Sequence, residues 1–573
     1  MSAEIALLVS NGWQVVQRWF QEQRSFAVWF AAIVCWASWW CWRFIITPRI
    51  STLEVKEYPY WIPVLGKTKI LSIIICGSRP DELEVMAYHS YITRRNCSIQ
   101  REPKRLMILK RQHFHNTNEP LQLTLFGTSV YFVSRAEDVS EVYRNTRTFT
   151  FDEFYHHIFI SMGTSGASVQ QIFAQLPARI KDPENTQGKP VAKLAKELQI
   201  AQLQPGPGLD ALERAQLAYL ECHVQPDAVL ESRYRYPDLL GGEVPSQTGS
   251  VEMSLWNWCA DLHVRAAQRA FFGSALDRLD PDLPQKFLEF DDLSWKLLYQ
   301  FPIFLARDTI AKRDYLRTAL KAFYNLPGEM RNDAEGWALD STEDRLRAIG
   351  IPIEDIASIA LILYWGANTN TRKAAFWLIC HLLSNPSLID PIRTETAGAF
   401  GPEGTITDLV HLHRHCHQLD AMWNETLRLT GVAASMRTVS ADTVLGGRML
   451  RAGNPLIIPY RQLHHDKGIF GDDIMTFRPE RFLNTKPKKD KRVRLEHFRP
   501  FGGGSTICPG RFITKRVVMI LVALLLRRFD ISMAGGSQDM PQADDWSPFL
   551  GIAGVKPGHD MRIRLTPRKA AAT

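Results

Sequence analysis

Apolar residues recur through most of the chain at helical spacing, in stretches long enough to cross a domain. Residues 354–383 are mostly apolar and stop at Asn385-Pro386, where the proline cannot continue a helix. At about 1.5 Å per residue, this stretch is predicted to form one helix of about 45 Å. Further helices are expected over 136–143, 419–429 and 512–526, and throughout 253–324 with a break at 301–304.

Strand and loop signals are fewer. Residues 123–133 are rich in β-branched and aromatic residues with partial alternation, which predicts a strand. Residues 182–208 and 233–249 are rich in loop-forming residues, so both are expected to be surface loops. Residues 535–558 are predicted to be a loop-rich sheet segment whose tip, 549–553, is placed to line a pocket. The pattern as a whole favours a mainly α protein with a smaller β-rich region.

The N-terminal region contains an uncharged stretch at residues 25–42, which is 18 residues long and rich in tryptophan. This length is at the short end for crossing a bilayer, and tryptophan suits the lipid–water interface. More basic residues follow the stretch than precede it, which places the body of the protein on the cytosolic side. No small-residue cleavage site follows, so the stretch is interpreted as an anchor rather than a removed signal peptide. A buried hydrophobic helix is the alternative.

The chain is accordingly divided into four segments. Residues 1–24 are expected to form an amphipathic helix on the membrane surface. Residues 25–46 are interpreted as the membrane anchor, and residues 47–66 as a hinge stiffened by Pro59 and Pro63. Residues 67–573 remain for the folded body.

Composition indicates the compartment and the class of partner. The chain of 573 residues is 45% hydrophobic and 22% charged, which is ample for one large core. Its nine cysteines show no paired framework, which suits a reducing compartment. The formal net charge is +8, and the basic run 486–494 supplies much of it. This run either docks an acidic protein domain or is a solvated loop. Because it lacks interleaved aromatic residues, nucleic-acid binding is not expected.

A histidine-rich run at 411–417 is a candidate metal site. His413 and His417 are four residues apart and Cys416 is adjacent, so these side chains have ligand types that zinc accepts. The run falls just before the helical stretch that bears Glu425. We do not predict a metal site there.

The most informative segment is the glycine-rich stretch 501–512, FGGGSTICPGRF, which carries the lone Cys508. Glycines at 502–504 allow positive φ and close approach of the backbone to a flat ligand. Backbone N–H groups freed by the turn and by the start of the next helix can stabilise a negatively charged sulfur. A single exposed thiolate on a rigid loop suits an axial ligand to haem iron. A buried structural cysteine before a core helix is the alternative.

The pattern Phe-x-x-Gly-x-x-x-Cys-x-Gly, from Phe501 to Gly510, resembles the haem-ligating loop of the cytochrome P450 family. Three upstream residues occur in the order that this family has. Glu425 and Arg428 share a helical face, and Arg481 lies in a Pro-Glu-Arg-Phe segment. The resemblance implies that these three residues form a buried ion network that fixes the cysteine loop.

The same resemblance implies a set of haem contacts. Cys508 is expected to ligate the iron of haem b, and Phe501, Gly502 and Gly510 are expected to form the loop against the ring. Arg437 matches the arginine that binds a haem propionate, a task for which a bidentate donor is suited. Thr506 stands where most relatives carry a basic residue, so one propionate contact is expected from elsewhere in the chain.

The helix on the oxygen side departs from the usual family pattern. The family places an acid and then a threonine there, to order the waters that protonate iron-bound dioxygen. In this sequence that pair falls on Thr369 and Asn370, followed by Thr371. The acid is therefore missing, and the alcohol is replaced by an amide or offset by one residue. Asparagine and threonine can still hold water, but neither donates protons as a carboxyl group does.

A similar asparagine occurs in one branch of the family, which contains bile-acid sterol hydroxylases and prostacyclin synthase. This sequence resembles that branch. Some members of that branch hydroxylate with dioxygen, whereas others isomerise an endoperoxide without dioxygen or electrons. We expect a monooxygenase that oxidises a lipophilic sterol, terpenoid or other secondary metabolite. The alternatives are a haem-thiolate isomerase or dehydratase, and a non-catalytic haem-binding protein.

The resemblance also implies a location and a redox partner. A fungal-type microsomal enzyme is expected, held on the endoplasmic reticulum membrane with residues 67–573, the catalytic domain, facing the cytosol. An NADPH-dependent cytochrome reductase is the expected electron donor, with 486–494 as its docking run.

Overall fold

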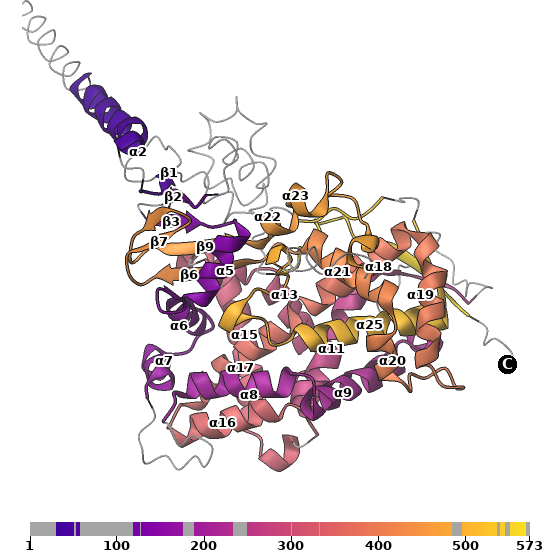
Figure 1. The fold of residues 1–573 in the computed structure, drawn as a ribbon. Helices are drawn as coiled ribbons and strands as arrows, with labels where there is room; N and C mark the ends of the chain where they lie inside the picture. The colour runs from indigo at the N-terminus through magenta and orange to yellow at the C-terminus, as the bar shows by residue number, and fades with distance from the viewer. Residues whose placement is uncertain are drawn as a thin grey trace, which may run out of the picture.

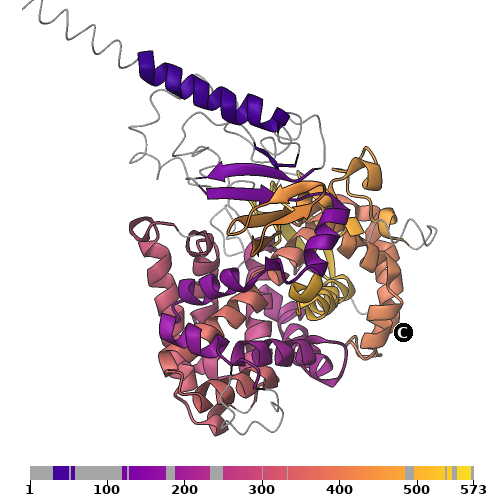
Figure 2. The same cartoon turned by 60° about the vertical axis from the view of Figure 1, so that its left-hand side comes forward.

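Helices form most of the described chain, and three small sheets lie at its edges (Figures 1 and 2). The structure is a computed structural model. It describes residues 30–50, 53–57, 119–125, 128–175, 188–232, 249–299, 301–331, 333–483, 496–535, 539–544 and 551–568. The expectation of a mainly α protein with a smaller β-rich region is confirmed.

The first half of the described chain contains eleven α-helices. They are α2 (Thr47–Ile50), α5 (Ala136–Arg144), α6 (Asp152–Ser161), α7 (Gly166–Phe173), α8 (Val191–Leu203), α9 (Pro207–His223), α10 (Pro226–Leu230), α11 (Leu255–Phe272), α12 (Ala275–Leu279), α13 (Leu283–Asp291) and α14 (Trp295–Leu298). Those of the second half are α15 (Arg307–Tyr324), α16 (Trp337–Ala348), α17 (Ile353–Asn368), α18 (Thr371–Ser384), α19 (Ile389–Thr396), α20 (Leu409–Arg414), α21 (His417–Thr430), α22 (Tyr460–His464), α23 (Lys467–Phe470) and α25 (Arg511–Arg528).

The strands form one mixed sheet and two small antiparallel ones. The largest sheet has the order β1 (Lys56–Glu57), β2 (Leu121–Leu125), β3 (Thr128–Phe132), β9 (Pro455–Pro459), β6 (Ala434–Val439) and β4 (Phe149–Thr150). The second pairs β10 (Phe529–Met533) with β11 (Arg562–Pro567) and β5 (Val251–Ser254), and the third pairs β7 (Thr443–Leu445) with β8 (Arg448–Leu450). Strand β6 runs antiparallel to β9, with Arg437 opposite Leu456.

The centre of the fold is built from helices that are buried on every face. All residues of α18 from Arg372 to Leu383 are buried, and so are those of α25 from Val517 to Leu526. A helix that is buried all round belongs in the middle of a large core. Helix α25 begins three residues after Cys508, so the cysteine loop is attached directly to one of these buried core helices.

Two of the predicted elements differ in the structure. The prediction of a single helix over 354–383 is wrong. Helix α17 ends at Asn368 and α18 begins at Thr371, with a turn between them. The prediction that 182–208 is one surface loop is also wrong. Helices α8 and α9 begin within it, because apolar residues such as Leu194 and Leu209 are buried against the core.

Other predicted elements are close to the observed ones. The helix over 136–143 is confirmed as α5. The strand over 123–133 is a hairpin of two strands, β2 and β3, which pair antiparallel. The break at 301–304 is confirmed, since a short 3₁₀ turn there separates α14 from α15. Most of the second predicted loop, 233–248, lies outside the described residues.

The described N-terminal part is a helix over 30–50 that projects beside the large sheet (Figures 1 and 2). Arg43 is paired with Glu57 of β1 at 2.8 Å, which connects this helix to the sheet. Within the described ranges, no helix combines the length and apolar character that membrane crossing requires. The segment 1–24, the start of the anchor and most of the hinge lie outside the described residues.

The fold contains three buried histidines, and we predict from them that its stability falls in acid. Burial lowers the pKa of His263 to about 4 and those of His381 and His464 to about 3, with nearby Arg428 acting in the same direction on the last two. An unfolded histidine has a pKa of about 6.5, so the unfolded chain binds more protons below that pH. The stability is complete above about pH 6.5 and falls by up to about 1.4 kcal/mol per histidine per pH unit below it.

The measurement is the free energy of unfolding by urea at several pH values between about 7.5 and 5. The control variant is His381→Phe, which keeps a ring stacked on Phe477, where the ring centroids are 4.2 Å apart. In this variant we expect the slope of the unfolding free energy against pH to decrease by the contribution of about one bound proton. A free energy that does not change between these pH values would contradict the prediction.

Candidate active site

A cavity of about 490 Å³ lies between the cysteine loop and helices α8, α11, α17 and α25. Most of its lining is apolar, and includes Phe154, Phe271, Leu363 and Leu427. The polar side chains in the lining are amides, hydroxyls and one thiol. Among the described residues that line it, none carries a charged side chain. Such a cavity suits a flat, largely apolar ligand.

Cys508 faces this cavity from a tight loop. Its backbone N–H donates to the carbonyl of Phe501 at 3.0 Å. Gly502 has a φ of +79°, and a Cβ there would also come within 3.1 Å of the Tyr460 hydroxyl. The thiol is free and exposed although it lies deep in the protein, because it faces the cavity rather than the outer surface. The glycine is therefore needed for the turn, and the turn presents the sulfur to a ligand.

The environment of the Cys508 thiol favours binding to a cation. Burial raises the pKa of this thiol, whereas the N–H groups of Gly510 and Arg511 and the charge of Arg511 act to lower it. The net effect is a raised pKa, so an isolated thiolate is disfavoured. A metal ion bound to the sulfur supplies the missing positive charge and keeps the ligand deprotonated.

Arg437 is a buried cation at the edge of the same cavity. Its guanidinium donates to the Ser435 hydroxyl at 2.7 Å and to the Thr506 hydroxyl at 2.5 Å. It packs over the rings of Tyr143 and Phe151. In the described part of the chain it has no carboxylate partner, since the ionisable groups that act on it are Tyr143, Tyr155 and Tyr460, and burial lowers its pKa. A buried guanidinium without a counter-charge fits the carboxylate of a ligand.

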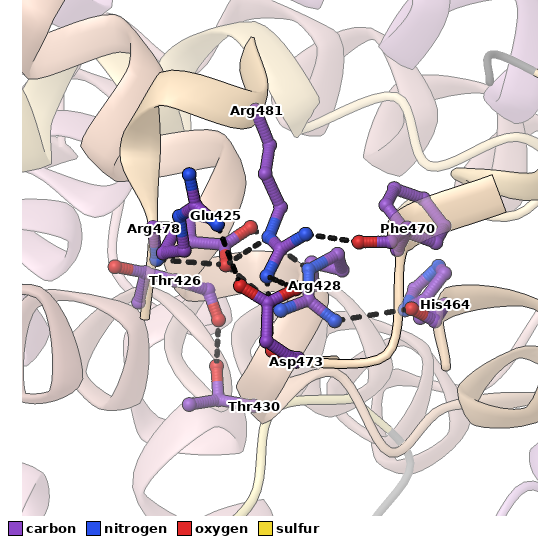
Figure 3. Close-up of polar contacts among 9 residues, drawn as sticks. All are labelled: Glu425, Thr426, Arg428, Thr430, His464, Phe470, Asp473, Arg478 and Arg481. Atoms are coloured by element: carbon purple, nitrogen blue, oxygen red, sulfur yellow. Dashed lines mark hydrogen bonds and ion pairs between the residues drawn. The ribbon is translucent and has the colours of Figure 1, made fainter. Parts of the chain in front are cut away.

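Behind the loop, Glu425 lies at the centre of a buried ion network (Figure 3). Both carboxylate oxygens accept hydrogen bonds from Arg428 at 2.8 Å, and both residues are fully buried. Arg481 donates to Glu425 at 3.3 Å and the backbone N–H of Arg478 donates at 3.0 Å. Arg481 also pairs with Asp473 at 2.6 Å. Every charge in this network therefore has a partner, which a buried ion pair requires.

The network is connected to the cysteine loop through His464. Arg428 donates to the backbone carbonyl of His464 at 3.2 Å (Figure 3). The ring Nε2 of His464 accepts from the backbone N–H of Arg499 at 3.1 Å, just before the loop begins. The lowered pKa keeps this ring neutral, which leaves Nε2 free to accept. Sequence patterns did not indicate His464 or Asp473, because neither has a local signal that distinguishes it.

The three residues predicted on the oxygen side are not equivalent. Asn370 and Thr371 line the cavity together with Cys508. The side chain of Asn370 accepts from the backbone N–H of Ile552 at 2.9 Å, and the Thr371 hydroxyl lies 3.2 Å from that of Thr514. Thr369 is not among the described lining residues, and its hydroxyl donates to the buried Asp291 at 2.8 Å.

The C-terminal tip predicted to line a pocket does so in part. Gly551 and Ile552 line the cavity, and residues 545–550 lie outside the described residues. A Cβ on Gly551 would lie 2.0 Å from Oδ1 of Asn370. Glycine is therefore required there for the amide to reach Ile552.

His413 and Cys416 of the histidine-rich run contact other parts of the protein. His413 pairs with Glu213, and the thiol of Cys416 donates to the carbonyl of Glu395 at 3.4 Å. Across the described ranges, no group of three or more histidine, cysteine or acidic side chains could hold a metal ion. The basic run 486–494 lies outside the described residues.

The family model described as "Cytochrome P450" matches residues 283–556, just under half of the chain, and this part contains α17, the Glu425 network and the cysteine loop. The chain belongs to the cytochrome P450 family. This P450 is 23% identical over 482 residues to the cytochrome P450 monooxygenase nodJ of Hypoxylon pulicicidum, covering 80% of this chain and 85% of that protein.

Two animal proteins are also similar to this P450. A 5-beta-cholestane-3-alpha,7-alpha-diol 12-alpha-hydroxylase of Sus scrofa is 26% identical over 366 residues, covering 58% of this chain and 70% of that protein. The prostacyclin synthase of Rattus norvegicus is 29% identical over 256 residues, covering 42% of this chain and 50% of that protein. These relatives match the branch indicated by the sequence, and this P450 is an oxidoreductase of the monooxygenase class.

The family binds haem through a cysteine thiolate. The residues of this P450 fit that cofactor in two respects. Burial raises the pKa of Cys508, the one thiol in the described lining, despite the charge of nearby Arg511, so the thiolate needs a further positive charge. Arg437, at the edge of the cavity, has no carboxylate partner in the described part of the chain and needs a negative charge. The iron and a carboxylate of haem supply these two charges.

Proposed function

We propose that this P450 hydroxylates or oxidises a lipophilic small molecule of the sterol, terpenoid or other secondary-metabolite class, using dioxygen and reductase electrons. The observation that supports the proposal is the apolar cavity of about 490 Å³ with Cys508 in its wall. Its described lining offers amides and hydroxyls but no charge, which favours an uncharged substrate with few polar groups.

The residues would divide the work as follows. Cys508 would hold the haem iron, Arg437 would hold a haem carboxylate, and the loop of Phe501, Gly502 and Gly510 would leave room for the ring. When bound, thiolate-ligated haem supplies the oxygen activation and O–O cleavage that the reaction requires. Asn370 and Thr371 would hold water in the cavity on the side of α17.

A second candidate reaction is favoured by the same lining. No carboxyl side chain lies among its described residues, and Asn370 and Thr371 would stand where the monooxygenase reaction needs proton delivery. An isomerase or dehydratase that uses no dioxygen has no need for that proton supply. The similarity to prostacyclin synthase points in the same direction.

The cellular setting is part of the proposal. Residues 1–24 would lie on the membrane, 25–46 would anchor the chain, 47–66 would form the hinge and 67–573 the catalytic domain on the cytosolic face of the endoplasmic reticulum. In support, the helix over 30–50 exposes apolar side chains, including Phe30, Ile33 and Trp42. An NADPH-dependent cytochrome reductase would donate electrons and would dock on 486–494.

The test is a screen of uncharged sterols and terpenoids against the purified full-length protein with a cytochrome reductase. A substrate should shift the haem absorption on binding and should then be hydroxylated only when NADPH and dioxygen are both present. The matched controls omit either NADPH or dioxygen. Product formation from an endoperoxide without either co-substrate would instead identify an isomerase. A protein that binds no lipophilic molecule and turns over none would overturn both reactions.

A further inference from the structure

The interruption between α17 and α18 is not explained by the residues within it. Helix α17 ends at Asn368, helix α18 begins at Thr371, and the turn between them contains neither glycine nor proline. Asn370 and Thr371 face the cavity, yet no acidic side chain lies among the described residues that line it. A carboxylate is nevertheless close by. Asp291, the last residue of α13, lies behind the turn and is 2% exposed.

Asp291 receives contacts from both sides of the interruption. Its Oδ1 accepts from the indole N–H of Trp365 at 3.1 Å and from the hydroxyl of Thr369 at 2.8 Å. Its Oδ2 accepts from the guanidinium of Arg372 at 2.7 Å and lies 3.1 Å from the ammonium of Lys373. One residue of α13 thus holds the last turn of α17, the turn itself and the first turn of α18.

The charge on Asp291 decides which role it can have. Burial raises the pKa of this carboxyl. Lys373, Arg372 and the Thr369 hydroxyl together lower the pKa by more than burial raises it, so the net effect is a lowered pKa. Arg372 and Lys373 are also almost completely buried. Asp291 is therefore an ionised acceptor with its oxygens occupied. It cannot donate a proton, but it can fix the position of the groups around it.

We propose that Asp291 is a positioning residue that holds, from α13, the turn between α17 and α18 in a fixed geometry. It holds Thr369 on the side away from the cavity. The turn then presents the next two residues, Asn370 and Thr371, to the cavity. Helix α13 packs against α11 and α15, so the same contact couples the position of this outer layer to the geometry of the turn.

The inference rests on the proposed monooxygenase function for one readout only, the hydrogen peroxide yield; the other readout, azole binding, needs no turnover. The variant is Asp291→Asn, which keeps the size of the side chain and removes its charge. The matched control is Glu343→Gln, because Glu343 is a buried carboxylate that also serves two cations, Arg331 and Arg347. Its contacts do not reach the turn. Thr369→Val removes the hydroxyl and leaves all the ion pairs in place.

Two readouts need no knowledge of the substrate. The first is the dissociation constant for 1-phenylimidazole, titrated by the haem absorption spectrum. The second is the hydrogen peroxide formed per NADPH consumed with the reductase. In Asp291→Asn and Thr369→Val we expect a dissociation constant raised about fivefold, the effect of losing one hydrogen bond, and a higher peroxide yield. The carbon-monoxide spectrum should be unchanged, since the Glu425 network is intact.

Each result supports or overturns the inference. It is supported if the Asp291 and Thr369 variants change both readouts while Glu343→Gln lowers the melting temperature alone. It is overturned if Glu343→Gln reproduces the changes, which would indicate general destabilisation, or if both readouts are unchanged in folded Asp291→Asn. If that variant does not fold, Thr369→Val decides, and wild-type readouts there overturn the inference. Because azole binding requires no turnover, failure to find a lipophilic substrate would not be confused with these outcomes.

Discussion

Replacing Cys508 by serine is expected to abolish monooxygenase turnover, with a loss of about a thousandfold or more, equivalent to over 4 kcal/mol in the barrier. The hydroxyl of serine is a much poorer electron donor to iron than a thiolate, and the donor in this position promotes O–O cleavage. The measurement is the carbon-monoxide difference spectrum of the reduced protein, together with NADPH-dependent product formation. The strongly red-shifted band of a thiolate-ligated haem should be lost.

The matched control for this experiment is Cys222→Ser. Cys222 is another free, exposed thiol, on α9, and does not line the cavity. Its variant should keep the wild-type spectrum and activity. An active Cys508→Ser enzyme with an unchanged spectrum would contradict the assignment of the axial ligand. Loss of haem altogether in that variant would still support it, because the ligand would then be needed for retention.

Glu425→Gln is expected to destabilise the fold by about 3–5 kcal/mol, because it leaves the fully buried guanidinium of Arg428 without its counter-charge, whereas Arg481 keeps its ion pair with Asp473. Arg428 is fully buried and Arg481 nearly so, and both donate to the Glu425 carboxylate (Figure 3). Since this network reaches the cysteine loop through His464, haem retention should fall together with stability. The measurements are the thermal unfolding temperature and the haem content per polypeptide.

Arg478→Gln provides the control within the same network. The Arg478 side chain pairs with Asp473 at 2.7 Å but is 54% exposed, and only its backbone N–H contacts Glu425. An exposed pair contributes at most about 1 kcal/mol, so this variant should retain its haem. If Glu425→Gln were as stable as Arg478→Gln, the buried network would have no role in holding the loop.

Local sequence patterns predicted the elements whose causes are local. Helix α5 follows from its own amphipathic spacing, and the ends of α18 and α25 follow from proline and from continuous apolar runs. The interruption at Thr369 and Asn370 was not predictable in this way. The turn is held by Asp291, which lies 78 residues earlier than Thr369, and by Ile552, which lies 182 residues after Asn370. The apolar pattern continues across the turn because both flanking helices are buried.

In the candidate site, too, some residues could be predicted from local motifs and others depend on distant parts of the chain. Cys508, Glu425, Arg428 and Arg481 stand in short motifs, so the sequence indicated them directly. The contributions of Asp473, His464 and Gly551 depend on which side chains the fold brings to them. A glycine whose Cβ would collide with Asn370 carries no sign of that contact in its own neighbourhood of the chain. Such residues can be found only once distant segments are placed together.

The uncharged lining of the cavity has a consequence for the order of reactions in which this enzyme takes part. With Arg437 paired to a haem carboxylate as proposed, a sulfate or carboxylate group of a substrate entering such a space would lose its hydration without gaining a partner, at a cost of several kcal/mol. For a lipophilic substrate of the proposed class, conjugated, water-soluble forms should therefore be rejected, whereas the free alcohol or ketone should be accepted. The oxidation must then precede any step that attaches an ionised group near the end that enters the cavity.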